Sequence, residues 1–203
     1  MKPTCSHFLT KRSGPPRRPA ASPFERLLKR LRIPAGAPEG VLAAEAWDEA
    51  LALAAPASIR LRLSLPDFLA RFNPYAQASS HLMSRLEGHT EVWLLAATIG
   101  SALEGRARDL FAGGRAFSGY LIEYFGIWLV DQALRGEIAA LRSLPDALSG
   151  ALTKRLMPGC QGFPLEAQAV FVQLVGADLG LTLTSGCQLY PRMSVTAAIG
   201  RRT

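Results

Sequence analysis

An alternating segment at residues 58–65, with the sequence SIRLRLSL, constrains the fold more than any other part of the chain. Apolar side chains occupy every second position, and Ser or Arg occupies the positions between them. Because successive side chains of a strand point to opposite faces, this pattern predicts a strand with one face in the core. The other face is expected to meet water, as is typical of antiparallel sheets.

A second strand is predicted at residues 91–100, EVWLLAATIG, which are almost continuously apolar and end at a glycine. The other predicted elements are strands at 180–184 and 194–199 and helices at 22–33, 38–55, 79–87, 101–113, 117–141, 145–155 and 164–175. Strands and helices do not alternate regularly, which argues against a doubly wound sheet. The expected class is therefore α+β, a single domain over residues 22–203 with a mostly antiparallel sheet flanked by helices.

The positive charge of the chain is concentrated at its N-terminus. Residues 1–32 contain nine Lys or Arg against one acid, whereas residues 33–203 contain fourteen against fifteen. Residues 1–21 are predicted to form a disordered basic tail. The remainder has no basic face interleaved with aromatic residues, so the sequence disfavours nucleic acid as a partner. The longest apolar run, residues 92–103, is shorter than the roughly twenty residues of a membrane span.

Cysteine usage and the distribution of polar residues predict neither a metal site nor catalytic residues. Three cysteines, at positions 5, 160 and 187, are too few and too scattered for a disulfide framework, which fits a cytoplasmic protein. The candidate nucleophiles Thr184, Ser185 and Ser194 have no His or acid at a recognisable spacing.

Two segments carry a family resemblance: residues 155–168, RLMPGCQGFPLEAQ, and residues 179–200, LGLTLTSGCQLYPRMSVTAAIG. Together they resemble the activation domain of cobalamin-dependent methionine synthase, and most closely its free-standing short forms. That family has an Arg-x-x-Pro-Gly-Tyr turn before a helix and a later Leu-Thr…Pro…Ser-Val stretch. The matched positions are Arg155, Pro158, Gly159, Phe163, Pro164, Gln168, Leu183, Thr184, Pro191, Ser194, Val195 and Gly200, with Thr98, Ile99 and Gly100 upstream.

The resemblance implies a binding site for S-adenosylmethionine at the Arg155 turn. The Arg155 guanidinium can bind the ligand's carboxylate through two parallel hydrogen bonds. Gly159 lets the backbone come close to the ligand, and Pro158 fixes the conformation of the turn. Met157 and Cys160 are expected to line the groove. From the residues alone, Arg155 also fits an ordinary cation at a helix end.

The family supplies a carboxylate from the long helix to bind the ligand's ammonium group. Glu123 and Asp131 are the candidates in this chain, and the spacing within GIWLVD favours Asp131. An ordinary acid on the helix surface is the competing interpretation for either residue.

The chain departs from the family pattern at several polar positions. Cys160 replaces the tyrosine of the turn, Gln161-Gly162 and Ser185-Gly186 replace polar pairs, and Met193 stands where lysine is frequent. The apolar positions are retained, which favours a conserved scaffold over conserved ligand chemistry.

Three functions remain open on the sequence. The first is a reactivation module that binds S-adenosylmethionine and supports reductive remethylation of cob(II)alamin. Cobalamin would be carried by a corrinoid protein or methyltransferase in trans, with an electron-donor protein. The chain is at most an accessory module, because it lacks cobalamin-carrying, homocysteine-binding and folate-binding segments.

The second possible function is a non-catalytic interaction protein that kept the fold and the surface that docks on a corrinoid protein. The third, which rests on the basic tail alone, is an accessory protein for nucleic acid or membrane surfaces.

Overall fold

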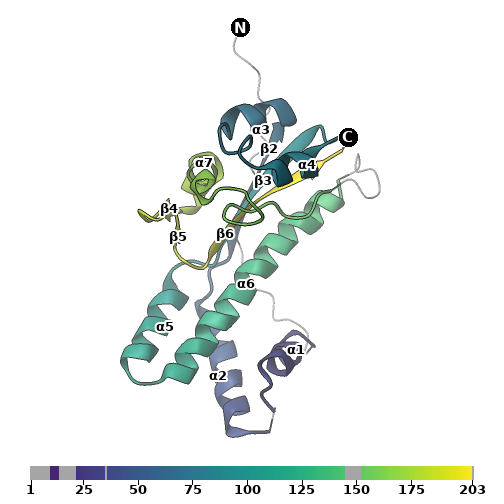
Figure 1. Ribbon diagram of the computed structural model, residues 1–203. Helices are drawn as coiled ribbons and strands as arrows, with labels where there is room; N and C mark the ends of the chain where they lie inside the picture. The colour runs from purple at the N-terminus through teal and green to yellow at the C-terminus, as the bar shows by residue number, and fades with distance from the viewer. Residues whose placement is uncertain (1–9, 14–21, 35, 145–151, 203) are drawn as a thin grey trace.

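A four-stranded antiparallel sheet organises the protein. The computed structural model describes residues 10–13, 22–34, 36–144 and 152–202. The strand order is β1-β2-β3-β6, and β4 and β5 form a separate pair (Figure 1). The bounds are β1 Thr10–Ser13, β2 Ala57–Ser64, β3 Glu91–Thr98, β4 Thr182–Leu183, β5 Leu189–Tyr190 and β6 Ser194–Arg201. This architecture confirms the predicted α+β class with an antiparallel sheet.

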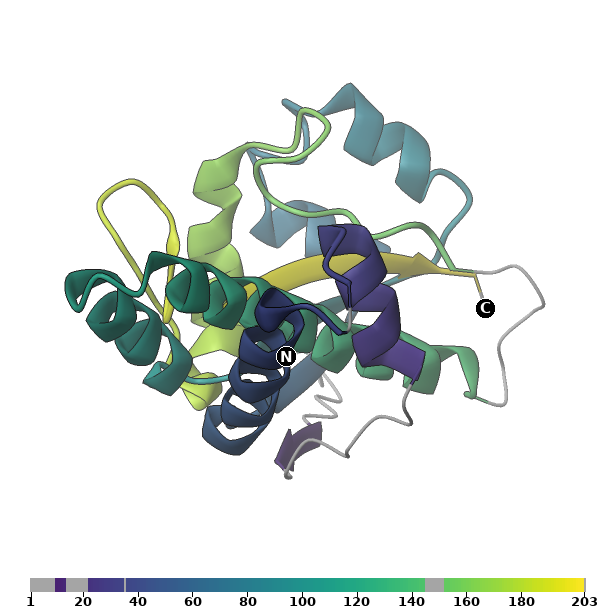
Figure 2. The same ribbon diagram turned by 90° about the horizontal axis from the view of Figure 1, so that it is seen from below.

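Helices cover both faces of the sheet (Figures 1 and 2). One face is covered by α1 Ser22–Leu31, α2 Pro38–Leu53, α5 Ala102–Ala112 and α6 Ala116–Arg142. The other face is covered by α3 Leu65–Arg71, α4 Ser80–Leu86 and a helical segment made of η1 Leu165–Ala167, α7 Gln168–Phe171, η2 Val172–Gly176 and η3 Ala177–Leu179.

Strand β3 is apolar throughout because it contributes to a core on each face. Trp93, Leu95 and Ala97 pack with the α6 side, and Val92 and Leu94 pack with the α3 side. All eight residues of β3 are buried. The continuous apolar run in the sequence therefore reflects burial on both faces rather than a change of periodicity.

The polar face of β2 is only partly solvated, contrary to the sequence prediction. Ser58 is buried, and its hydroxyl donates a hydrogen bond of 2.8 Å to the Glu137 carboxylate of α6. Arg60 pairs with the same carboxylate at 3.5 Å. Arg62 and Ser64 are exposed as expected. Helix α6 crosses this face at one end of β2 and covers the polar residues there.

The helix predicted over 145–155 is wrong for residues 152–155, which run in extended form beside β6. Isolated bridges join Leu152 to Arg201 and Leu156 to Ala198. The edge of β6 offers unpaired backbone groups, and pairing with them replaces a local helix. Residues 145–151 lie outside the described residues.

Strand β1 and helix α3 also differ from the sequence prediction. Thr10–Ser13 forms β1, paired with β2, within the segment expected to be disordered, while residues 1–9 and 14–21 lie outside the described residues. Helix α3 was missed altogether. It begins after Ser64, whose hydroxyl accepts a hydrogen bond from the Asp67 amide at 3.1 Å. Among the described residues, no helix combines the length and the apolar character needed to cross a membrane.

Candidate functional site

The segment that carries Arg155 is docked onto the free edge of β6. Leu156 exchanges backbone hydrogen bonds of 3.0 and 2.8 Å with Ala198, and the Thr153 amide donates to the Gly200 carbonyl at 3.0 Å. Between the two bridges, three residues of this segment, 153–155, face only two of β6, 199–200. The arrangement is a bulge, which turns side chains out of the regular alternation. Arg155 lies in this bulge and reaches α6.

Arg155 forms an ion pair with Asp131 of α6. Its guanidinium donates a hydrogen bond to the Asp131 carboxylate, which also accepts one of 2.5 Å from Arg135. The Arg155 and Asp131 side chains are 34% and 30% exposed, so solvent and a ligand can reach the pair. Partial burial by itself raises the pKa of Asp131, but the hydrogen bonds and charges of Arg135 and Arg155 outweigh it and lower the pKa.

The lowered pKa predicts a pH-dependent contribution of Asp131 to stability. A carboxyl whose pKa is lower in the folded than in the unfolded protein stabilises the fold at pH values above its unfolded pKa, which is near 3.8 here. That contribution is lost as the pH falls through the lower folded pKa. Asp131→Asn is therefore expected to be less stable than the wild type at pH 5–7, with the difference shrinking below about pH 4. Urea unfolding at a series of pH values measures it, and a difference that is the same at all pH values contradicts the ion pair. Asp48→Asn on α2 controls for the loss of one negative charge.

Glu123, the other candidate acid, lies elsewhere. It pairs with Arg192 at 3.2 Å, and the Arg192 amide donates to Glu104 at 3.1 Å. The structure thus brings Asp131, and not Glu123, to Arg155. This placement agrees with the preference for Asp131 drawn from the sequence spacing.

A surface groove of about 680 Å³ lies between the C-terminal half of α6 and the 152–161 segment, which passes beside that helix in Figure 1. We call it the Arg155 groove. Of the predicted site residues, Arg155, Met157 and Cys160 line it, while Pro158 and Gly159 form the adjoining turn. The described residues that line it are Arg135, Ile138, Ala139, Arg142, Thr153, Lys154, Arg155, Met157, Cys160, Gln161 and Ile199.

The turn after Met157 is held by its own backbone and by one buried ring. Gly159 has a φ of +81°, and its amide donates a 2.8 Å hydrogen bond to the Phe163 carbonyl. A left-handed φ of this kind favours glycine. Phe163 is 3% exposed and packs near Phe72 and Phe171. Cys160, at the position of the family's tyrosine, is exposed.

Met193, which stands where the family often has lysine, is a core residue. It is 6% exposed and belongs to the core on the α6 side. A Cβ atom built on Gly126 of α6 would lie 2.3 Å from the Met193 sulfur, so the two residues are closely fitted. This departure from the family pattern therefore serves packing.

Three groove residues were not singled out from the sequence: Arg135, Arg142 and Lys154. Arg135 follows Asp131 by four residues and Arg142 follows Arg135 by seven, a spacing that places them along one face of a helix. The periodicity was visible, but residues 152–155 of the partner segment were predicted as the end of a helix, so their position beside α6 was not expected. No group of three or more His, Cys, Asp or Glu in the described part of the chain is arranged to hold a metal ion.

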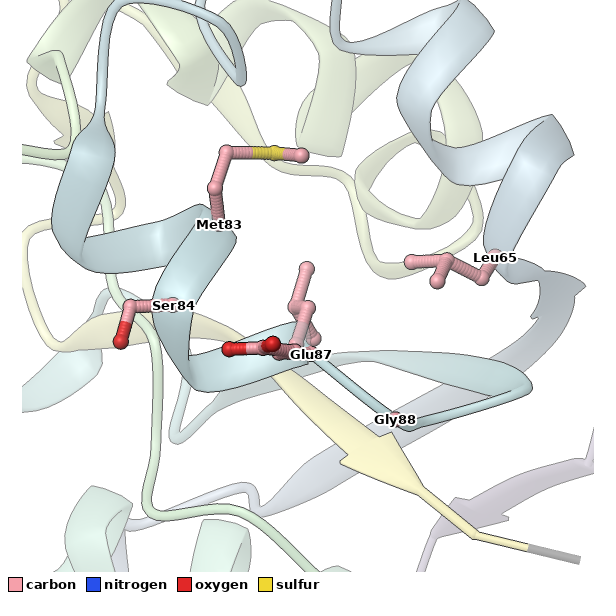
Figure 3. A pocket seen from close by; sticks show the side chains of 6 residues that line it. Leu65, Met83, Ser84, Glu87 and Gly88 are labelled. Carbon is pink, nitrogen blue, oxygen red and sulfur yellow. The ribbon is translucent and has the colours of Figure 1, made fainter.

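A second cavity, of about 350 Å³, lies between the start of α3 and helix α4 (Figure 3). It is lined by Leu65, Met83, Ser84, Leu86, Glu87 and Gly88. Among the described residues, it shares none with the Arg155 groove, and no cation lines it. Its chemistry does not fit a ligand that carries a carboxylate.

No protein-family model and no curated protein matches this chain. Among solved structures, the chain is similar to one described as the MetH reactivation domain bound to AdoHcy. The TM-score is 0.57 with 12% sequence identity, and the match covers 96% of this chain and 78% of the other. At this identity the likeness shows a shared fold, the fold that the sequence resemblance implies.

Proposed function

We propose that this chain is an S-adenosylmethionine-binding reactivation module that acts with a cobalamin-dependent methyltransferase of the methionine synthase type. The observation that carries the proposal is the Arg155–Asp131 pair at one end of the Arg155 groove. It occurs in the fold of a reactivation domain, whose solved form has AdoHcy bound. Two independent features, a sequence motif and a spatial pair, thus support the same site.

The pair suits the amino-acid end of the ligand, which carries a carboxylate and an ammonium group. Arg155 would bind the carboxylate and Asp131 the ammonium group, each through a charge-assisted hydrogen bond. Without ligand, Asp131 pairs with both Arg155 and Arg135. A bound zwitterion would replace the Arg155–Asp131 pair with two new ion pairs, and Arg135 would keep its hydrogen bond to Asp131. Met157 and Cys160 would contact the remainder of the ligand.

In this role the chain binds and orients the methyl donor, and cobalamin belongs to a partner. S-adenosylmethionine supplies a methyl group, and an electron-donor protein supplies the reducing equivalent. Arg155 and Asp131 hold the donor at the protein surface, where a corrinoid-carrying protein in trans can reach it. The exposure of both side chains supports a site that is open to a partner.

The test is calorimetric titration of the full chain with S-adenosylmethionine and with S-adenosylhomocysteine. Arg155→Ala is expected to weaken binding by about 2–4 kcal/mol, because it leaves a charged ligand group unpaired. Cys160→Tyr is expected to tighten binding by about 1–2 kcal/mol through added contact area and a hydroxyl. Arg192→Ala is a matched control, since it removes an arginine that pairs with an acid of the same helix outside the groove. Equal binding by the wild type and Arg155→Ala contradicts the site.

The second candidate is a non-catalytic interaction protein that retains the fold. The exposed Cys160 in place of an aromatic residue favours it, because the turn loses a ring and a hydroxyl at the groove. Absence of binding by the wild type, Arg155→Ala and Cys160→Tyr at millimolar ligand supports this candidate over the first.

A further inference from the structure

Among the described residues, four cations and no acid line the Arg155 groove. Arg135 and Arg142 come from α6, and Lys154 and Arg155 come from the segment docked on β6. Asp131 lies just beyond the lining and binds Arg135 and Arg155. Asp131 therefore offsets part of the positive charge at one end of the groove.

Among the described residues, the cations at the other end of the groove have no acidic partner. Within the described part of the chain, neither Arg142 nor Lys154 forms an ion pair. Both are exposed and line the groove from opposite sides, one from α6 and one from the bulge. Arg142 lies in the last turn of α6, where a cation also stabilises the helix dipole. That role accounts for Arg142 but not for Lys154 facing it.

The dimensions of the groove fit a phosphate-bearing molecule. Arg135 and Arg142 are seven residues apart, which is about 10 Å along a helix. A chain of two or three phosphates can contact cations spread over such a length. The volume of about 680 Å³ lies in the range of small-molecule sites. Met157, which is only partly buried, adds an apolar surface beside the cations, against which a base can pack.

We propose that the Arg142–Lys154 end of the groove binds the phosphates of a small nucleotide. Arg142 and Arg135 contact phosphate oxygens from α6, and Lys154 contacts them from the facing bulge. Guanidinium and ammonium groups bind phosphate through charge-assisted hydrogen bonds. The proposal goes beyond the proposed function, because the sulfonium group of S-adenosylmethionine is a cation and gains nothing from these residues.

The test is calorimetric titration of the full chain with ATP, pyrophosphate and adenosine at low salt. We expect ATP and pyrophosphate to bind and adenosine to bind at least about tenfold more weakly. The double variant Arg142→Gln/Lys154→Gln is expected to weaken ATP binding about tenfold or more, and added NaCl should weaken wild-type binding. The matched control is Arg71→Gln/Arg85→Gln, which removes two exposed cations from α3 and α4 on the other face of the sheet. This control should bind ATP as the wild type does.

These titrations test the nucleotide proposal independently of the proposed S-adenosylmethionine site. Tighter binding of ATP than of pyrophosphate supports a nucleotide with base contacts, and equal binding supports recognition of the phosphates alone. No binding of either compound by the wild type, or equal weakening in both double variants, overturns the proposal. The proposal is also overturned if an oligonucleotide displaces ATP at a lower concentration than pyrophosphate requires, because the surface would then serve nucleic acid. S-adenosylhomocysteine binding that survives in Arg142→Gln/Lys154→Gln leaves the proposed function intact in every case.

Discussion

Replacing Phe72 with alanine is expected to lower the free energy of unfolding by about 3–5 kcal/mol. Phe72 is fully buried on the α3 side of the sheet. Its ring stacks on Phe68 with centroids 4.5 Å apart and meets the edge of Phe171 at 5.0 Å. Alanine removes these contacts and leaves a cavity that α3 and the 165–179 segment cannot both close. Urea unfolding measures the change.

An exposed phenylalanine provides the control for this substitution. Phe117→Ala on α6 removes the same atoms from a side chain that is 37% exposed, so the loss should be clearly smaller. Phe72 also lies 6.1 Å from Phe163, which anchors the turn after Arg155. Equal losses for the two variants would show that the stacked rings do not form the core of this face.

Strands β2 and β3 were predictable because their hydrophobic patterns record burial directly. In residues 58–65 the apolar positions fall on one face, and β2 buries Ile59, Leu61 and Leu63 there. Residues 91–98 are apolar on both faces because helices cover both sides of β3. The long helix α6 was also predicted closely, since its apolar positions keep a helical period over many turns.

The segment at 152–156 was not predictable, because its structure depends on a distant strand. The local sequence of these residues does not distinguish an extended segment from a helix. Their extended conformation is determined by the hydrogen bonds to Ala198 and Gly200. The buried Ser58–Glu137 hydrogen bond has the same character, since its partners are 79 residues apart in sequence. Polar residues that pair across such distances look like solvent-facing residues in the sequence.

The turn of the candidate site was predictable from the sequence, but the cluster of cations in its groove was not. The sequence placed Arg155 before a Pro-Gly break and named two acids on the long helix, of which the structure brings Asp131 to Arg155. The cations opposite each other in the groove were missed. Arg142 and Lys154 become neighbours of one groove only when the 152–161 segment docks beside α6.

Replacing Glu91 with leucine is expected to lower the free energy of unfolding by about 3–5 kcal/mol, the cost of leaving a buried charge unpaired. Glu91 and Arg201 face each other across β3 and β6 and are 5% and 3% exposed. The Arg201 guanidinium lies 3.7 Å from the Glu91 carboxylate, and its Nε and Nη2 have no hydrogen-bond partner in the described structure. Without Glu91, Arg201 has no carboxylate to offset its loss of water.

Two further variants separate the buried pair from the exposed partner of the same acid. Arg62 also binds Glu91, but its side chain is 49% exposed, so Arg62→Leu should cost no more than about 1 kcal/mol. The double variant Glu91→Leu/Arg201→Leu removes both buried charges, and it should be more stable than Glu91→Leu alone. A double variant as unstable as the sum of its single variants would mean that the two charges act independently. Urea unfolding of the wild type, Glu91→Leu, Arg201→Leu, the double variant and Arg62→Leu then tests whether the unpaired Arg201, rather than lost packing around Glu91, causes the instability.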